Sequence, residues 1–259
     1  MSLKGLVLSV ILRYVWFWIL IIAYSEIKIS WKFIVEHLKL GSPLIVATLL
    51  SGSAQFVDGF IVTSKFDEAT FAVFRYGARE LPLAMLLANA LSNAMLPEFS
   101  VREKMKENLV KLKINITQLM HFLFPLTAVL LVFSHPVFPI LFNPKFEESA
   151  TIFNIYLLLI ISRLLLPQTI LNGLKLSREI MLASLLELIL NVSLSLFLVQ
   201  FYGIAGIAFA TFIAYLFEKV FLVIVVRQKL NIRLKEYLPV KFYLIYSAGI
   251  LIIFTFAEV

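Results

Sequence analysis

The sequence predicts an all-α integral membrane protein, a bundle of about eight transmembrane helices. Apolar side chains make up 61% of the 259 residues, and the mean hydropathy is +0.95. Soluble domains use only about 45–50% apolar residues. The apolar residues are also gathered into runs of about 20, the length that a helix needs to cross roughly 30 Å of hydrocarbon. Such runs are longer than the alternating strands of an outer-membrane barrel, so we expect helices.

Eight runs are predicted to span the membrane, at residues 5–24, 41–62, 70–97, 113–134, 150–171, 178–200, 203–225 and 239–257. The first run has no basic cluster before it and no small-residue cleavage pattern after it, so we interpret it as a retained helix and not as a signal peptide. We treat residues 1–259 as a single transmembrane domain. In this division, 5–24 is a preceding helix, 25–40 is a cytoplasmic amphipathic linker and 41–259 is the main bundle.

Three connections have recognisable patterns. The linker contains "SWKFIVEHLK", whose apolar residues Trp31, Ile34, Val35 and Leu38 follow the spacing i, i+3, i+4, i+7. This spacing predicts an interfacial amphipathic helix, and a docking helix for a soluble partner is the alternative. The segment 135–149 holds three prolines and predicts an outer loop. The connection 201–203 is so short that the flanking spans should form a tight antiparallel hairpin.

The positive charges predict the topology. Of the 23 lysines and arginines, 15 lie in the segments 25–40, 98–113, 172–178 and 226–241 and five lie within predicted spans, whereas the remaining segments outside the spans hold only Lys4, Lys65 and Lys145. The positive-inside rule places the first set in the cytoplasm, so both termini are predicted to be extracytoplasmic. We therefore interpret the net charge of +7 as a topology signal and an attraction to anionic membrane lipid, and we expect no nucleic acid partner.

One predicted span, 70–97, carries charges where hydrocarbon is expected. A buried ionisable group costs about 2.5–3.5 kcal/mol on insertion scales and usually faces a bundle interior or a cavity. On a continuous helix, four polar residues fall within about 80° of one another, provided that the helix continues past Pro82: Arg75, Arg79, Asn89 and Asn93. Glu80 lies off this stripe and is expected to pair with a neighbouring helix.

The two arginines of this stripe are the predicted substrate contacts. Two guanidinium groups one turn apart repel each other unless an anion or carboxylates lie between them, and arginine matches phosphate geometry in a bidentate way. Asn89 and Asn93 are predicted to contribute to the same site. Arg163 stands alone in its span and is either structural or a further substrate contact. Lys219 is expected to pair with Glu187 or Glu218.

Two further spans carry polar stripes. In 41–62 the stripe is Thr48, Ser51, Gln55 and Asp58, and in 178–200 it is Ser184, Glu187, Asn191 and Ser195. We predict coupling or gating roles for Asp58, Gln55, Glu187 and Asn191. The alternative is plain hydrogen bonding between helices, at about 0.6 kcal/mol per contact.

No catalytic or metal-binding motif competes with this interpretation. The three histidines lie in different segments without metal-ligand spacing, the chain has no cysteine, and no glycine-rich phosphate loop is present. We therefore expect neither an enzyme nor a metal or other cofactor. A membrane-embedded transferase using Asp58 and Glu187 would lack soluble substrate-binding loops.

Two stretches resemble a known family. "LKLGSPLIVATLLSGSAQFVDGFIVTSKFDEATFAVFRYGARELPL" and "LNVSLSLFLVQFYGIAGIAFATFIAY" are similar to the polysaccharide and O-antigen flippases of the multidrug/oligosaccharidyl-lipid/polysaccharide (MOP) exporter superfamily. In that family a Gly-x-Pro opens the first helix, an Asp lies near its outer end, and a Tyr-Gly-Ile turn precedes a small-residue helix. The residues that match are Gly41, Pro43, Asp58, Tyr76, Asn191, Gly203 and Gly206.

The resemblance implies a two-lobed transporter of the cytoplasmic membrane, of which residues 41–259 form the C-terminal lobe. Such a protein moves a polyprenyl-diphosphate-linked glycan, such as an O-antigen or lipopolysaccharide precursor, by alternating access, with the arginines meeting the diphosphate. A missing N-terminal lobe or a second copy of the chain would complete the cavity. The alternatives are a cation-coupled drug exporter of the same superfamily and a non-transporting membrane assembly subunit.

Overall fold

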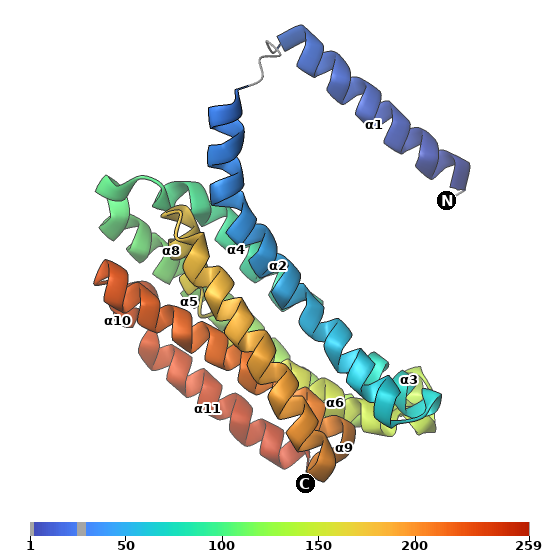
Figure 1. The fold of residues 1–259 in the computed structure, drawn as a ribbon. Coiled ribbons are helices and arrows are strands. Elements are labelled where there is room, and N and C mark those ends of the chain that lie inside the picture. The colour runs from blue at the N-terminus through green and yellow to red at the C-terminus, as the bar shows by residue number, and fades with distance from the viewer. Residues whose placement is uncertain (1–2, 25–29, 259) are drawn as a thin grey trace. The chain divides into compact units, whose positions relative to one another are not determined.

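The computed structural model describes residues 3–24 and 30–258, without the side chains of residues 3, 4, 6, 51, 54 and 55. The regular elements in this part of the chain are all helices (Figure 1). They are α1 (Leu3–Tyr24), α2 (Trp31–Lys65), α3 (Glu68–Gly77), α4 (Pro82–Phe99), α5 (Met105–Leu141), α6 (Glu147–Leu157), α7 (Leu159–Arg163), α8 (Pro167–Gly173), α9 (Ser177–Leu230), α10 (Leu234–Tyr237) and α11 (Val240–Ala257). Short 3₁₀ turns at Arg102–Lys104 and Pro144–Phe146 join three of them.

The chain divides into two units, Met1–Lys39 and Leu40–Val259. In the first unit, α1 exposes large apolar side chains such as Trp16 and Trp18, as a helix in contact with lipid does. The second unit contains the buried core. Along α5, the side chains of Leu112, Ile116 and Leu123 are fully buried at helical spacing, so one face of this helix packs inward.

The prediction of a helical membrane bundle is confirmed. Five helices of the described residues are each long and apolar enough to cross a membrane. One of them, α9, consists of two arms, because Gly203 has non-helical angles of φ 55° and ψ −139°. We call residues 177–202 the first arm and residues 204–230 the second arm. Hydrogen bonds between Asn191 and Thr211 and between Ser184 and Glu218 join the arms, so they form the predicted antiparallel hairpin.

Two predicted spans are interrupted. The prediction of one continuous helix over 70–97 is wrong, because α3 ends at Gly77 and α4 begins at Pro82. Proline lacks an N–H and clashes with the preceding turn, so it favours the start of a helix. Gly77 meanwhile packs closely against α6, where an added Cβ would lie 2.5 Å from the carbonyl oxygen of Ser149. The predicted span 150–171 is divided among α6, α7 and α8, with a bend of 48° before α8.

Two other helices run further than predicted. α2 begins at Trp31, so the amphipathic segment and the span after it are one helix that continues through Gly41 and Pro43. α5 continues through Pro136 and Pro139 into the segment predicted as an outer loop. Proline is tolerated inside membrane helices because neighbouring helices and local adjustments satisfy the freed backbone groups.

Three of the basic segments, 98–113, 172–178 and 226–241, lie near one another in the second unit. Ser177 Oγ donates a hydrogen bond of 3.1 Å to the carbonyl oxygen of Leu40, and Lys229 pairs with Glu179. Lys113 Nζ donates a bond of 2.8 Å to the carbonyl oxygen of Lys235. These contacts agree with the predicted alternation of the loops. The side of the membrane that each end faces stays a prediction.

Candidate functional site

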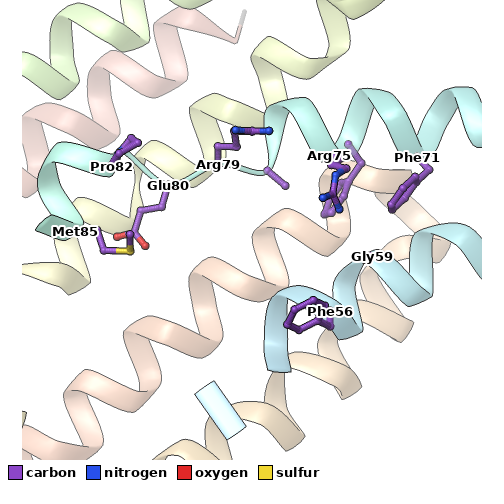
Figure 2. A pocket seen from close by; sticks show the side chains of 10 residues that line it. Phe56, Gly59, Phe71, Arg75, Arg79, Glu80, Pro82 and Met85 are labelled. Carbon is purple, nitrogen blue, oxygen red and sulfur yellow. The ribbon is translucent and has the colours of Figure 1, made fainter. Parts of the chain in front are cut away.

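A pocket of about 450 Å³ lies where α2, α3, the connection 78–81 and the start of α4 meet. Figure 2 shows Phe56 and Gly59 on α2, Phe71 and Arg75 on α3, and Arg79 on the connection. The lining residues are Phe56, Gly59, Phe71, Phe74, Arg75, Ala78, Arg79, Glu80, Pro82 and Met85. Two arginines and one carboxylate are thus set among aromatic and other apolar side chains.

The two predicted arginines both line this pocket. Arg75 lies in the last turn of α3 and Arg79 in the connection after it, and both side chains are exposed. Within the described residues neither forms an ion pair. Because the helix ends between them, Arg75 and Arg79 are not held on one continuous helical face, as the sequence had suggested.

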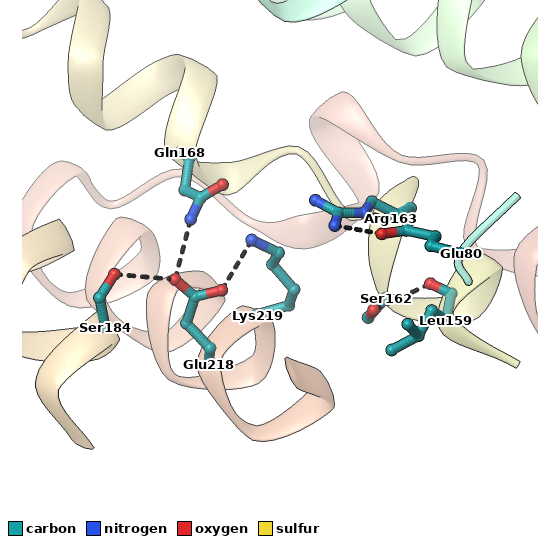
Figure 3. A network of polar contacts seen from close by, with 8 residues as sticks. All are labelled: Glu80, Leu159, Ser162, Arg163, Gln168, Ser184, Glu218 and Lys219. Carbon is teal, nitrogen blue, oxygen red and sulfur yellow. Dashed lines mark hydrogen bonds and ion pairs between the residues drawn. The ribbon is translucent and has the colours of Figure 1, made fainter. Parts of the chain in front are cut away.

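Glu80 does not neutralise these arginines, because it is occupied by Arg163. The Arg163 Nη2 atom donates a hydrogen bond of 2.5 Å to Oε2 of Glu80, and its Nε donates to Oε1, so the pair is bidentate (Figure 3). The guanidinium carbon also lies 5.5 Å from the ring centre of Tyr215. The expected pairing of Glu80 with another helix is confirmed, whereas the expectation that Arg163 stands alone is wrong.

The asparagines of the predicted stripe are placed differently. Asn89 and Asn93 lie on α4, beyond the break, with exposed side chains, and they are not among the residues that line the pocket. The predicted stripe required a helix that continues through residues 78–81. Its interruption separates the asparagines from the arginines.

A second, apolar pocket of about 290 Å³ adjoins the first through a shared residue. Arg79 lines both pockets. The remaining lining comes mainly from the end of α5, with Tyr76 of α3 and Phe153 of α6. Arg79 therefore stands between a charged pocket and an apolar one.

Asp58 lies in a buried network that joins three helices. Thr211 Oγ1, on the second arm of α9, donates a hydrogen bond of 2.7 Å to Oδ2 of Asp58. Tyr156 Oη, on α6, donates a longer one of 3.4 Å to the same oxygen, and Asn191 Nδ2 donates one of 3.0 Å to Thr211 Oγ1. The other carboxylate oxygen, Oδ1, has no hydrogen-bond partner among the described residues.

A second buried network surrounds Glu218 (Figure 3). Lys219 Nζ lies 2.8 Å from its Oε2, while Gln168 Nε2 and Ser184 Oγ lie 3.0 and 3.2 Å from its Oε1. The prediction that Lys219 pairs with Glu187 or Glu218 is confirmed for Glu218. Lys219 is buried.

Glu187 lies between the two networks along the first arm of α9. It follows Ser184 by three residues and precedes Asn191 by four, and its side chain is fully buried. Neither of its carboxyl oxygens has a hydrogen-bond partner in the described part of the chain, and the same holds for Ser195 Oγ. The side chains of Gln55 and Ser51, also predicted to be polar contacts, lie outside the described residues.

Sequence reasoning missed the partners on the other helices. Thr211, Tyr156 and Gln168 bond to the predicted carboxylates but were not singled out. Thr211 could have been identified from the sequence, because it is a polar residue between Gly206 and Glu218 on a helix of mostly small and apolar residues. Tyr156 and Gln168 have none, because their roles depend on how the broken segment α6 to α8 packs.

An all-helical membrane bundle with buried, paired carboxylates and an arginine-lined pocket is typical of a membrane transporter. Residues 4–259 match the family described as lipid II flippase MurJ, and the chain belongs to this family. The chain is also similar to a solved lipid II flippase MurJ in its inward closed conformation, with a TM-score of 0.60 and 22% identity over 89% of this chain and 50% of that one.

A second solved structure has a similar fold. It is a MOP superfamily transporter from Pyrococcus furiosus, with a TM-score of 0.55 and 19% identity over 83% of this chain and 52% of that one. The chain thus spans about half the length of the structures that it matches. No curated protein matches it. This likeness agrees with the expected flippase-like fold, and the family whose model matches is that of the lipid II flippases and not that of the O-antigen flippases.

Proposed function

We propose that this chain is part of a flippase that moves a polyprenyl-diphosphate-linked glycan across the cytoplasmic membrane, and that its substrate is lipid II, the lipid-linked precursor of peptidoglycan. The observation that supports this most is the pocket in which Arg75 and Arg79 lie without an ion pair among the described residues. The family match supports lipid II over an O-antigen or lipopolysaccharide precursor.

The charge of the pocket suits a diphosphate. Arg163 pairs with both oxygens of Glu80, so the negative charge of this carboxylate is already balanced by a cation other than Arg75 or Arg79. A guanidinium group offers a planar fork of donors that pairs with phosphate oxygens in a bidentate way. A drug exporter that binds cations would instead need unpaired carboxylates on the pocket wall, and the one carboxylate there is paired.

We assign a coupling or gating role to Asp58 and Asn191, which share a hydrogen-bond network. The polar stripes of the sequence add Gln55 and Glu187 to this proposal. The hydrogen bonds of Asp58 cross from α2 to the hairpin and to α6. A movement of α2 relative to the hairpin would break them, and a cation or proton bound at Oδ1 would change their strength. Either the missing N-terminal lobe or a second copy of the chain would provide the opposite wall of the transport cavity.

The arginine assignment is tested by complementation of a strain depleted of its lipid II flippase. The chain is expressed together with an N-terminal half of a related flippase, or alone to test the second-copy alternative. We expect Arg75→Lys and Arg79→Lys to impair growth and the double alanine variant to abolish it, while Arg102→Ala, an exposed arginine away from the pocket, has no effect. Membrane abundance is measured for each variant. A double alanine variant at normal abundance that still supports growth would rule out the arginines as substrate contacts.

The coupling role is tested by Asp58→Asn. The amide keeps the shape of the side chain and can still accept a bond from Thr211, so we expect the protein to assemble. We also expect lipid II movement in proteoliposomes to lose its response to an imposed ion or pH gradient. Unchanged gradient dependence in the Asp58→Asn protein would show that this carboxylate is not the coupling group.

A further inference from the structure

Glu187 has a combination of properties that no other carboxylate of the second unit shares in the described residues. Its side chain is fully buried, and both carboxyl oxygens lack a hydrogen-bond partner. Asp58 and Glu218 are buried as well, but each accepts hydrogen bonds from neighbouring side chains. An ionised carboxylate is an acceptor with about four lone-pair sites, so leaving both oxygens of a buried one without donors is costly.

The charged groups around Glu187 would not balance a negative charge on its own carboxylate. The charged groups that act on it are Glu218 and Lys219, on the second arm of α9, and Asp58 on α2. Lys219 is paired with Glu218 at 2.8 Å. Tyr215 on the same arm also interacts with Glu187, and Arg163 on α7 is paired with Glu80. Among the described groups that act on Glu187, the cation is Lys219, and its charge is already shared with Glu218.

From these contacts we infer that Glu187 is a proton-binding site of the transporter, a carboxylic acid that connects the Asp58 network with the Glu218–Lys219 network. The inference deepens the proposed function, because the proton would be taken up and released during the transport cycle. The site itself rests on the burial and contacts of Glu187 and does not depend on the identity of the glycan.

The helical register supports a connection between the two networks. Ser184, which bonds Glu218, lies three residues before Glu187, and Asn191, which bonds Thr211, lies four residues after it. All three therefore share one face of the first arm, which packs on the second arm. Chains of acidic side chains inside membrane proteins are typical proton relays. Conformational opening that admits water would let the acid lose its proton to one network or the other.

A divalent metal ion is a weaker interpretation of the same position. No group of three or more histidine, aspartate or glutamate side chains in the described residues is close enough to hold one. A divalent ion needs about six oxygen ligands at short range. A single proton needs only one carboxyl oxygen.

The test uses the purified full chain in lipid nanodiscs, without substrate, and infrared difference spectra recorded across pH. The carbonyl stretch of a protonated carboxyl group is separate from that of a carboxylate and shifts in D₂O. We expect the wild-type chain to show this band and Glu187→Gln to lose it. Glu179→Gln, on the same arm but paired with Lys229 at the helix start, should keep it.

Each other outcome counts against the inference. A band that persists in Glu187→Gln and disappears in Asp58→Asn or Glu218→Gln would place the proton elsewhere. A band that sodium removes at constant pH would make a metal cation the ligand. Glutamine is the neutral isostere of a protonated glutamate, so a Glu187→Gln chain that fails to fold would mean that the ionised form is required. The arginine complementation fails or succeeds independently of these spectra, so the two proposals are tested separately.

Discussion

The ion pair between Glu80 and Arg163 provides a sharp test of the site geometry. Replacing Arg163 with methionine keeps a long side chain against Tyr215 but leaves the Glu80 carboxylate without its bidentate partner. The side chain of Glu80 is only 8% exposed and that of Arg163 is 20% exposed. Removing one partner of a buried pair costs about 3–5 kcal/mol, chiefly because an uncompensated charge stays buried.

Because a fifth of the Arg163 side chain is exposed, we expect the lower end of that range, about 3 kcal/mol. This corresponds to roughly a hundredfold change in the unfolding equilibrium constant. The double variant Glu80→Gln/Arg163→Met removes both charges and should recover to within about 1 kcal/mol of the wild-type stability, since an ion pair replaced by uncharged groups of similar volume is often neutral.

The measurement is equilibrium unfolding of the purified chain in mixed micelles, followed by far-ultraviolet circular dichroism. The two single variants and the double variant form a complete double-mutant cycle. If Arg163→Met is as stable as the wild-type chain, the pair is not buried as the structure shows. If the double variant is as unstable as the single one, lost packing against Tyr215 and not an unpaired charge accounts for the effect.

Three further predictions concern packing, capping and topology. Gly77→Ala should cost about 1–3 kcal/mol in the same unfolding assay, because its Cβ would meet the backbone of α6, whereas Gly249→Ala, with nothing within 4 Å, should be neutral or stabilising. The hydrogen bonds that Asp67 accepts at the start of α3 lower its pKa. This cap therefore stabilises α3 at pH values above the ordinary pKa of aspartate, and its contribution is lost as the pH falls through the lowered pKa. Amide exchange in the first turn of α3 should accelerate in that pH range, and an unchanged rate would contradict the cap. In this cysteine-free chain, Lys145→Cys should react with a membrane-impermeant thiol reagent on intact cells and Lys106→Cys should not; the reverse pattern would invert the topology.

The membrane class and most of the spans could be predicted because hydrocarbon thickness sets a length that the sequence must match. The interruptions could not. Prolines occur inside α2 at Pro43 and inside α5 at Pro125 without breaking those helices. The helix predicted over 70–97 is nevertheless broken before Pro82, where α4 begins. A proline permits a break, and packing decides whether one forms. Here Gly77 lies directly against α6, and this contact depends on residues about 75 positions away.

The candidate site was predictable to the same extent. The stripe of Ser184, Glu187 and Asn191 faces inward as its helical spacing indicates, because a polar stripe in a membrane helix avoids lipid. Its partners lie on the second arm of α9, and other pairs of the site join more distant helices. Arg163 and Glu80 are 83 residues apart in sequence, and no periodicity within one helix can pair them.

The sharp turn at Gly203 bears on how the chain enters the membrane. The first arm of α9 carries Glu187 and the second carries Glu218 and Lys219, and each charge inserted alone would cost about 2.5–3.5 kcal/mol. Two arms that insert together already supply some partners to each other, since Ser184 bonds Glu218 and Asn191 bonds Thr211. The turn residues Phe201 and Tyr202 are uncharged, so no charge has to cross with the turn itself. We therefore expect residues 177–230 to insert as one helical hairpin, before the helices that later surround it are all in place.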